Sequence, residues 1–282
     1  MTGIKVILVP ICDADTGAIP LETALQLGAR FQASVRALHV RADPSAAVPL
    51  VGEGMSGTMV EEMMNVAEQQ AADRAARVRA MFEGLCGRYP PGPGGAGESL
   101  IERVGREEET AACFAKFSDL VVCAKPKQDR DPATALTLNA ALMEGGRPVL
   151  LMPNVVDGTL GGRIAIAWNG STEATRAIHA ALSFLTEASA VTVLAAEDEE
   201  SPDFGSAELA QYLGHHGVSA TAHRFSPNGR DEGEALLAEA ASVHADMLVM
   251  GAYTHSRLRQ LILGGVTRHI MSHATIPVLL SH

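Results

Sequence analysis

The residues best placed to do chemistry are glycines near the C-terminal end of the sequence. The run Asp246–Gly251 is short, apolar and ends in glycine, which is typical of a buried strand of a parallel sheet. Residues 252–263 follow as a loop that turns helical, and Gly264 and Gly265 come next. Glycine lets backbone amides approach a ligand closely, and N–H groups at a helix start attract phosphate. This stretch therefore predicts binding of a phosphate-bearing ligand.

The charge of this stretch points in the same direction. The chain carries a net charge of −11, yet the residues from Gly251 to the end include no Asp or Glu and do include Arg257, Arg259 and Arg268. A locally positive patch attracts a polyphosphate, and a solvated helix face explains the arginines equally well. The negative charge of the whole chain argues against general nucleic-acid binding, whose affinity comes mainly from neutralised phosphates.

Apolar strands and amphipathic helices alternate along the whole chain. The expected strands are Ile4–Val9, Val35–Val40, Ser99–Val104, Leu120–Ala124, Pro148–Met152, Ile164–Trp168, Val191–Ala195, Ala220–Phe225, Asp246–Gly251 and Ile276–Leu280. The expected helices are Leu21–Phe31, Met59–Phe82, Glu107–Phe117, Ala133–Met143, Glu173–Leu185, Ala207–Leu213, Glu232–Val243 and Arg268–Ala274. Strand–helix–strand units of this length predict parallel sheets with helices on their faces.

The second half of the chain repeats the plan of the first. Residues 117–124 align directly with residues 244–251, and residues 146–152 align with residues 275–281. Asn154–Gly162 contains three glycines and is expected to be the linker. Internal duplication predicts two domains, residues 1–154 and residues 163–282.

In this context the C-terminal stretch resembles the same region of a universal stress protein domain. The ATP-binding members of that family carry Gly, two residues, Gly, nine residues, Gly and then Ser or Thr. Gly251 and Gly264 keep the residue types and the spacing, and Val266 and Thr267 continue as in the binding members. The resemblance covers nearly the whole chain. It implies an α/β fold of two tandem doubly wound domains, each a five-stranded parallel sheet with helices on both faces, as in the adenine nucleotide alpha hydrolase-like fold.

Two positions depart from the binding motif. Thr254 stands where the second glycine is expected and narrows the space for phosphate, and Gly265 keeps an amide but lacks the hydroxyl group of the expected Ser or Thr. At the end of the first strand of this half, Asn169 replaces an Asp that contacts adenine or ribose in binding members. Asn still donates and accepts hydrogen bonds but lacks the charge.

The resemblance implies a site at the carboxyl ends of the strands of the second half, where doubly wound sheets bind ligands. ATP, with Mg²⁺, is the expected ligand. Ala167 and Trp168 are expected beside Asn169, with Leu194 as an apolar floor. Met250 and Gly251 are expected near the sugar or base. The full set of candidate residues is Ala167, Trp168, Asn169, Leu194, Met250, Gly251, Thr254, Gly264, Gly265, Val266 and Thr267.

The first half is expected to have lost this site. Its corresponding loop, Cys123–Pro132, contains no glycine and two prolines, which remove N–H donors. Cys12 stands in register with the acidic position of binding members, and Asp13 is offset by one. We interpret this half as a built-in partner that pairs with the other domain. The resemblance implies that the edge near Ile276–Leu280 mediates the pairing, and it leaves open whether the chain also forms a homodimer.

Composition is that of a globular protein, with 47% apolar and 20% charged residues. No signal peptide is evident and no window approaches about 18 uninterrupted apolar residues, so a cytoplasmic protein without a membrane partner is expected. The four cysteines show no metal-ligand spacing. Three functions remain open: a stress-response protein that binds an adenine nucleotide, a nucleotide-free pseudo-dimeric scaffold that acts through protein partners, and a slow ATPase. Since no nucleophile–base–acid pattern or GxxxxGK[ST] loop is present, a non-enzymatic binding protein is the prediction.

Overall fold

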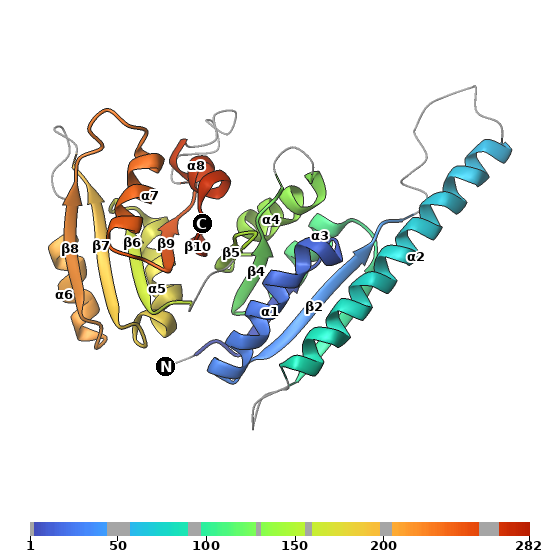
Figure 1. The fold of residues 1–282 in the computed structure, drawn as a ribbon, viewed down its shortest axis with the longest axis horizontal. Coiled ribbons are helices and arrows are strands. Elements are labelled where there is room, and N and C mark those ends of the chain that lie inside the picture. The colour runs from blue at the N-terminus through green and yellow to red at the C-terminus, as the bar shows by residue number, and fades with distance from the viewer. Residues whose placement is uncertain are drawn as a thin grey trace. The chain divides into compact units, whose positions relative to one another are not determined.

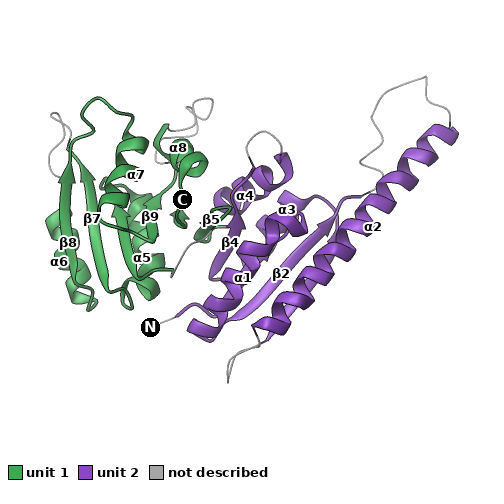
Figure 2. Cartoon of the chain, in the orientation of Figure 1, with its two compact units in different colours: residues 1, 146–282 green, residues 2–145 purple. Residues whose placement is uncertain are grey.

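The protein is described from a computed structural model, which covers residues 3–43, 57–89, 97–127, 131–155, 160–197, 205–253 and 265–282. Contacts divide the chain into an N-terminal unit of residues 2–145 and a C-terminal unit of residues 146–282, drawn in purple and green in Figure 2. Two of the candidate residues, Thr254 and Gly264, lie outside the described residues, as does most of the predicted loop 252–263.

The N-terminal unit contains a parallel sheet in the order β3-β2-β1-β4 (Figure 1). The strands are β1 (Val6–Pro10), β2 (Ser34–Arg41), β3 (Glu98–Val104) and β4 (Leu120–Ala124), and the helices are α1 (Ala14–Phe31), α2 (Gly57–Arg88), α3 (Glu107–Ala115) and α4 (Pro132–Glu144). Helix α1 packs beside α2, and α3 beside α4. The predicted strands and helices of this half are present.

Helix α1 begins earlier than the predicted start at Leu21. The side chain of Asp13 accepts a hydrogen bond from the N–H group of Asp15 at 3.0 Å and so caps the helix at Ala14. Pro20 lies inside the helix and is buried. The hydrophobic pattern alone starts at Leu21, which is why it missed the first turns.

Helix α2 buries a stripe of apolar residues only in its second half. Ala75, Val78 and Leu85 are buried where the helix contacts β2 and β3. In the first half Met59 is 54% exposed and Met64 36% exposed. The stripe therefore contributes to the core only where a sheet lies beneath it.

The C-terminal unit contains six strands in the order β5-β10-β9-β6-β7-β8. The strands are β5 (Val149–Met152), β6 (Arg163–Ala167), β7 (Ala190–Ala196), β8 (Ala220–Phe225), β9 (Met247–Gly251) and β10 (Val278–Ser281). The helices are α5 (Thr172–Leu185), α6 (Ser206–His215), α7 (Glu232–Ser242) and α8 (Gly265–His273). In Figure 1, α7 and α8 lie in front of this sheet, and α5 and α6 behind it.

All strand pairs of this unit are parallel except one. β5, the last strand of the first sequence repeat, runs antiparallel to β10, with Leu151 opposite Val278 and Val149 opposite Leu280. Contacts thus group β5 with the second repeat, whereas the sequence alignment assigns it to the first. The α/β class and the tandem plan are confirmed, and the proposed boundaries at residues 154 and 163 stay predictions of the sequence repeat.

In both repeats an aspartate just before the fourth strand accepts hydrogen bonds from backbone N–H groups near the start of the first strand. Asp119, before β4, accepts hydrogen bonds from the backbone N–H groups of Lys5 and Val6 at 2.9 and 3.0 Å. Asp246, before β9, accepts from the N–H groups of Gly161, Gly162 and Arg163 at 2.9 to 3.1 Å. These two aspartates are paired by the sequence alignment of residues 117–124 with 244–251, so the duplication extends to side-chain contacts.

Candidate functional site

The strand order of the C-terminal unit reverses between β6 and β9. The chain proceeds from β6 to β7 and β8 on one side, and β9 and β10 lie on the other. Ala167 is paired with Leu194 of β7, and Ile166 with Val249 of β9, so Met250 follows at the same level. The fold thereby brings three candidate residues from three strands to adjacent rows at the edge where doubly wound sheets bind ligands.

These three residues differ in exposure. Leu194 and Met250 are only 1% and 5% exposed and form part of the core. Their side chains therefore lie beneath the surface at this edge and are not accessible to a ligand. Ala167 and the neighbouring Trp168 are half-buried, and Asn169 is exposed. The N–H group of Trp168 donates to the carbonyl group of Leu194 at 2.9 Å and so continues the pairing with β7 beyond the end of β6.

Asn169 and Ser171 shape the turn between β6 and α5. The Asn169 side-chain oxygen accepts a hydrogen bond from the N–H group of Ser171 at 3.2 Å. The Ser171 hydroxyl group accepts from the N–H group of Ala174 at 3.1 Å, so Ser171 is the N-cap of α5, as predicted. The side-chain amide N–H groups of Asn169 have no hydrogen-bond partner among the described residues. They are free to donate to a ligand at this edge.

Gly251 has a packing role that the sequence motif did not reveal. A Cβ atom on Gly251 would lie 2.5 Å from the backbone nitrogen of Ala174 and 2.7 Å from the carbonyl carbon of Glu173. Such distances are too short for any side chain, so glycine is required for β9 to end against the first turn of α5. Close helix–strand packing of this kind is a recognised reason for glycine in doubly wound folds.

Helix α8 begins at Gly265, which is exposed. Among the described residues, a Cβ atom there would meet Oδ2 of Asp231 at 4.0 Å. The other carboxylate oxygen of Asp231 accepts from the N–H group of Gly233 at 2.9 Å, which caps α7, and lies 3.5 Å from Nδ1 of His269. A carboxylate beside a helix start is electrostatically favourable. The negative charge of Asp231 therefore opposes the approach of any other anion to the start of α8.

Thr267 connects α8 to the end of β9. It is 6% exposed, and its hydroxyl oxygen accepts from the backbone N–H group of Tyr253 at 3.4 Å. Tyr253 has φ +58°, a left-handed conformation that is uncommon for a bulky residue. Burial raises the pKa of its phenol, and the positive charge of Arg268 acts in the opposite direction. The phosphate contacts predicted for Thr267 and for the half-buried Val266 stay predictions.

The corresponding edge of the N-terminal unit is built differently. Asp13, the acidic residue offset by one, caps α1 and lies 3.4 Å from the Arg77 guanidinium group. The in-register residue Cys12 donates its S–H group to the Thr137 hydroxyl group at 3.7 Å. Asp131 caps α4 by accepting from the N–H group of Thr134 at 3.2 Å. Asp13, Cys12 and Asp131 therefore each have a hydrogen-bond partner within the protein at this edge.

Within the described parts of the chain, no three His, Cys, Asp or Glu side chains are grouped so that they could hold a metal ion. In the same residues, no helix combines the length and apolarity needed to cross a membrane.

The topology defines a class of protein: α/β units whose strand order reverses within a mostly parallel sheet. Residues 162–282 match the universal stress protein family. No curated protein sequence matches the chain.

Solved structures extend the similarity over both units. A universal stress protein from Archaeoglobus fulgidus superimposes with a TM-score of 0.68 at 16% identity and covers 98% of this chain and 95% of its own. A putative universal stress protein from Pseudomonas aeruginosa UCBPP-PA14 gives 0.58 at 14% identity, covering 99% and 93%. A protein of unknown function from Pseudomonas aeruginosa PAO1 gives 0.57 at 14% identity, covering 99% and 92%. At these identities the likeness confirms the fold alone.

Proposed function

We propose that the C-terminal unit binds an adenine nucleotide, ATP with Mg²⁺, and that the chain is a cytoplasmic stress-response protein whose interactions change on binding. The main support is the position of α8, which begins at Gly265 on the chain segment that leaves β9, beside the reversal of strand order. From Gly251 onward the sequence has no carboxylate side chain. Backbone amides at this helix start suit phosphate oxygens.

The end of β6 would hold the base or ribose. Ala167 and Trp168 are half-buried there, and the Asn169 amide N–H groups have no hydrogen-bond partner in the described part of the chain. Since the described residues contain no metal-binding cluster, Mg²⁺ would arrive bound to the phosphates. We propose binding without catalysis, because the sequence lacks a nucleophile–base–acid arrangement around these residues.

The first experiment is to identify any ligand that co-purifies. Mild purification, acid extraction and mass spectrometry should yield ATP, ADP or AMP, and calorimetry of the ligand-free chain should then give saturable binding of Mg·ATP. An absence of nucleotide in the extract together with no heat and no thermal shift at millimolar ATP would contradict the proposal.

A variant that restores the family motif tests where the ligand binds. Gly265→Ser supplies the missing hydroxyl group, and in the described part of the chain the atom nearest to its new Cβ, Oδ2 of Asp231, would be 4.0 Å away. We expect several-fold tighter ATP binding, equivalent to about 1 kcal/mol for one added hydrogen bond. Gly214→Ser, on α6 with open space around it, is the matched control and should leave affinity unchanged. Equal affinities in both variants would place the ligand elsewhere.

A nucleotide-free scaffold is the second candidate, and one observation favours it. The Asp231 carboxylate lies beside Gly265 and supplies negative charge where a phosphate would bind. If ATP binding is absent in the parent chain and also in Gly265→Ser, the scaffold function is the better explanation.

A further inference from the structure

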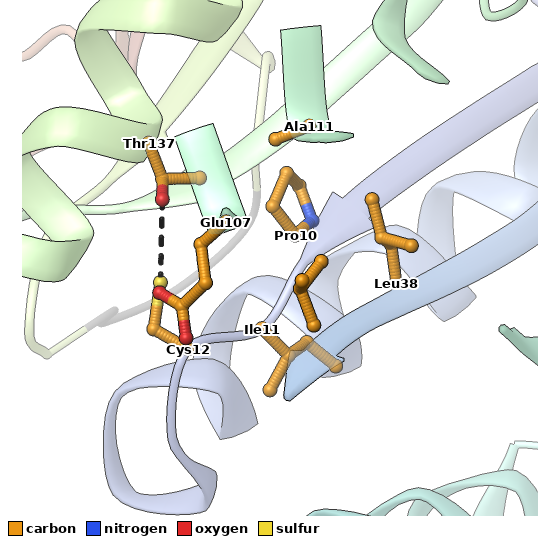
Figure 3. Close-up of a pocket in the computed structure, with 8 residues that line it drawn as sticks. Pro10, Ile11, Cys12, Leu38, Glu107, Ala111 and Thr137 are labelled. Carbon is orange, nitrogen blue, oxygen red and sulfur yellow. Dashed lines mark hydrogen bonds between the residues drawn. The ribbon is translucent and has the colours of Figure 1, made fainter. Parts of the chain in front are cut away.

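A small cavity lies in the N-terminal unit at the carboxyl ends of β1 and β2 (Figure 3). It is lined by Pro10, Ile11, Cys12, Leu38, Val40, Glu107, Ala111 and Thr137. Its volume of about 10 Å³ gives room for the centre of about one water molecule. It adjoins β1, where the strand order of this unit reverses between β2 and β4.

The polar groups of this cavity come from three different elements. Figure 3 shows the Glu107 carboxyl group, at the start of α3, directed toward the Cys12 side chain that follows β1. Thr137 of α4 is 3% exposed and accepts the Cys12 S–H group, which leaves its own hydroxyl hydrogen to donate. Oε2 of Glu107 is buried and has no hydrogen-bond partner among the described residues.

A charged carboxylate is poorly suited to this environment. The cavity walls are mostly apolar, and an oxygen without a partner there favours the neutral acid. Burial raises the pKa of Glu107. The neighbouring Cys12 side chain and the positive charge of Arg74 on α2 lower it, and the charges of Glu108 on α3 and Asp131 before α4 raise it. Burial, with the nearby charge of Glu107, also raises the pKa of Cys12, so the thiol stays protonated.

We propose that Glu107 is a proton-binding site that couples the stability of the N-terminal unit to pH, with its neutral carboxyl group held by Cys12 and one water molecule in the cavity. The water bridges Oε2 of Glu107 and the hydroxyl group of Thr137. This cluster stands at the reversal of strand order, in the unit whose nucleotide motif is absent. Proton uptake here is independent of nucleotide binding in the C-terminal unit.

The direction of the pH effect follows from linkage. Below the ordinary glutamate pKa of 4.5, Glu107 is protonated in the folded and the unfolded state. As pH rises above that value, the unfolded state loses its proton first, because the folded-state pKa is the higher one. The folded unit then binds more protons than the unfolded one, and its stability falls with rising pH until the folded-state pKa is passed.

The test compares the parent chain with Glu107→Gln, which keeps the size and hydrogen bonding of a neutral acid. Hydrogen exchange of β1 to β4 amides between pH 4.5 and 8 reports opening of the N-terminal unit. We expect the opening constant of the parent to rise relative to Glu107→Gln by up to about tenfold per pH unit within the window. Glu109→Gln is the control, because Glu109 is exposed and paired with Arg106, and it should follow the parent. Parallel pH profiles for parent and Glu107→Gln would overturn the proposal.

Two measurements do not depend on that variant folding. Infrared difference spectra of the parent should show a neutral carboxylic acid C=O band that disappears as pH rises, and its absence over the whole range would overturn the proton site. A high-resolution crystal structure should show one water molecule between Glu107 and Thr137, with Thr137→Val removing it. A dry cavity would overturn the bridging role of water.

Discussion

The starts of α8 and α4 form a natural comparison, because both helices connect the fourth and fifth strands of their repeats. Helix α8 begins at an exposed glycine, and the sequence from Gly251 onward has no acidic residue. Helix α4 is capped by Asp131 and lies beside Cys12 and Glu107. Two copies of one topology thus present different chemistry, a helix start with an exposed glycine in one and a carboxylate-rich cluster in the other.

The difference shows that the fold determines the position of a possible site, whereas the side chains determine its chemistry. The order of strands fixes where a ligand can bind, since it creates the edge at which adjacent helices diverge. Whether that edge accepts phosphate depends on a few residues at the helix starts. At these positions the N-terminal unit has Asp131 as a helix cap, and Cys12 and Glu107 beside it. The C-terminal unit has kept glycine.

Removal of the two equivalent aspartates should have the largest effect and tests how far the repeats are alike. We expect Asp246→Ala to lower the free energy of unfolding of the C-terminal unit by about 3 kcal/mol, because three backbone N–H groups lose their acceptor. Asp119→Ala should cost the N-terminal unit about 2 kcal/mol, since two N–H groups lose theirs.

Trp168 allows unfolding of the C-terminal unit to be measured separately from unfolding of the N-terminal unit. It is the single tryptophan of the chain, so its fluorescence during denaturation follows the C-terminal unit, while hydrogen exchange of β1 and β4 follows the other. A larger loss in Asp119→Ala than in Asp246→Ala would contradict the counting of hydrogen bonds and with it the equivalence of the two sites.

Gly251 offers a second test, because the family motif and the packing give it different roles. Gly251→Ala places a Cβ atom against the α5 backbone, and we expect a loss of about 1–3 kcal/mol in the stability of the C-terminal unit. Gly214→Ala, where the space is open, should gain up to about 1 kcal/mol from helix propensity. Denaturation followed by Trp168 fluorescence measures both. An unchanged stability in Gly251→Ala would mean that the glycine is kept for a ligand alone.

This double role of Gly251 illustrates how much the sequence could predict. Periodicity and the internal repeat predicted every described strand and helix to within a few residues, except the start of α1 at the Asp13 cap and the ends of α2. The resemblance, rather than the spacing, placed Ala167, Leu194 and Met250 at the carboxyl ends of their strands, and the strand pairing brings these three residues to adjacent rows. Spacing could not show that β5 pairs with β10, because pairing between edge strands leaves no periodic signal in either segment.

The site was less predictable than the fold for a related reason. Asp231 and Glu107 belong to no motif, and their importance follows from distance in space: Asp231 is near Gly265 and Glu107 near Cys12. The only signal that the sequence held was their place at the start of a helix, where acidic residues are common in any case. Contacts between residues so far apart in the sequence become visible only in the folded structure.

The smallest expected effect is a change in Mg·ATP affinity in a variant of Asp231. It tests whether charge at the helix start explains the difference between the two units. Asp231→Asn keeps an oxygen that can cap α7 and removes the negative charge beside Gly265. If the two units differ because of charge at the helix start, this change should tighten Mg·ATP binding to the C-terminal unit by about two- to fivefold, the equivalent of about 0.3–1 kcal/mol for a charge at a helix terminus. Calorimetry at low ionic strength gives the affinity, and the gain should shrink with added salt. Glu232→Gln, one residue further along α7 and exposed, controls for a general change in charge, so an equal gain in both variants would show that Asp231 has no special place in the site.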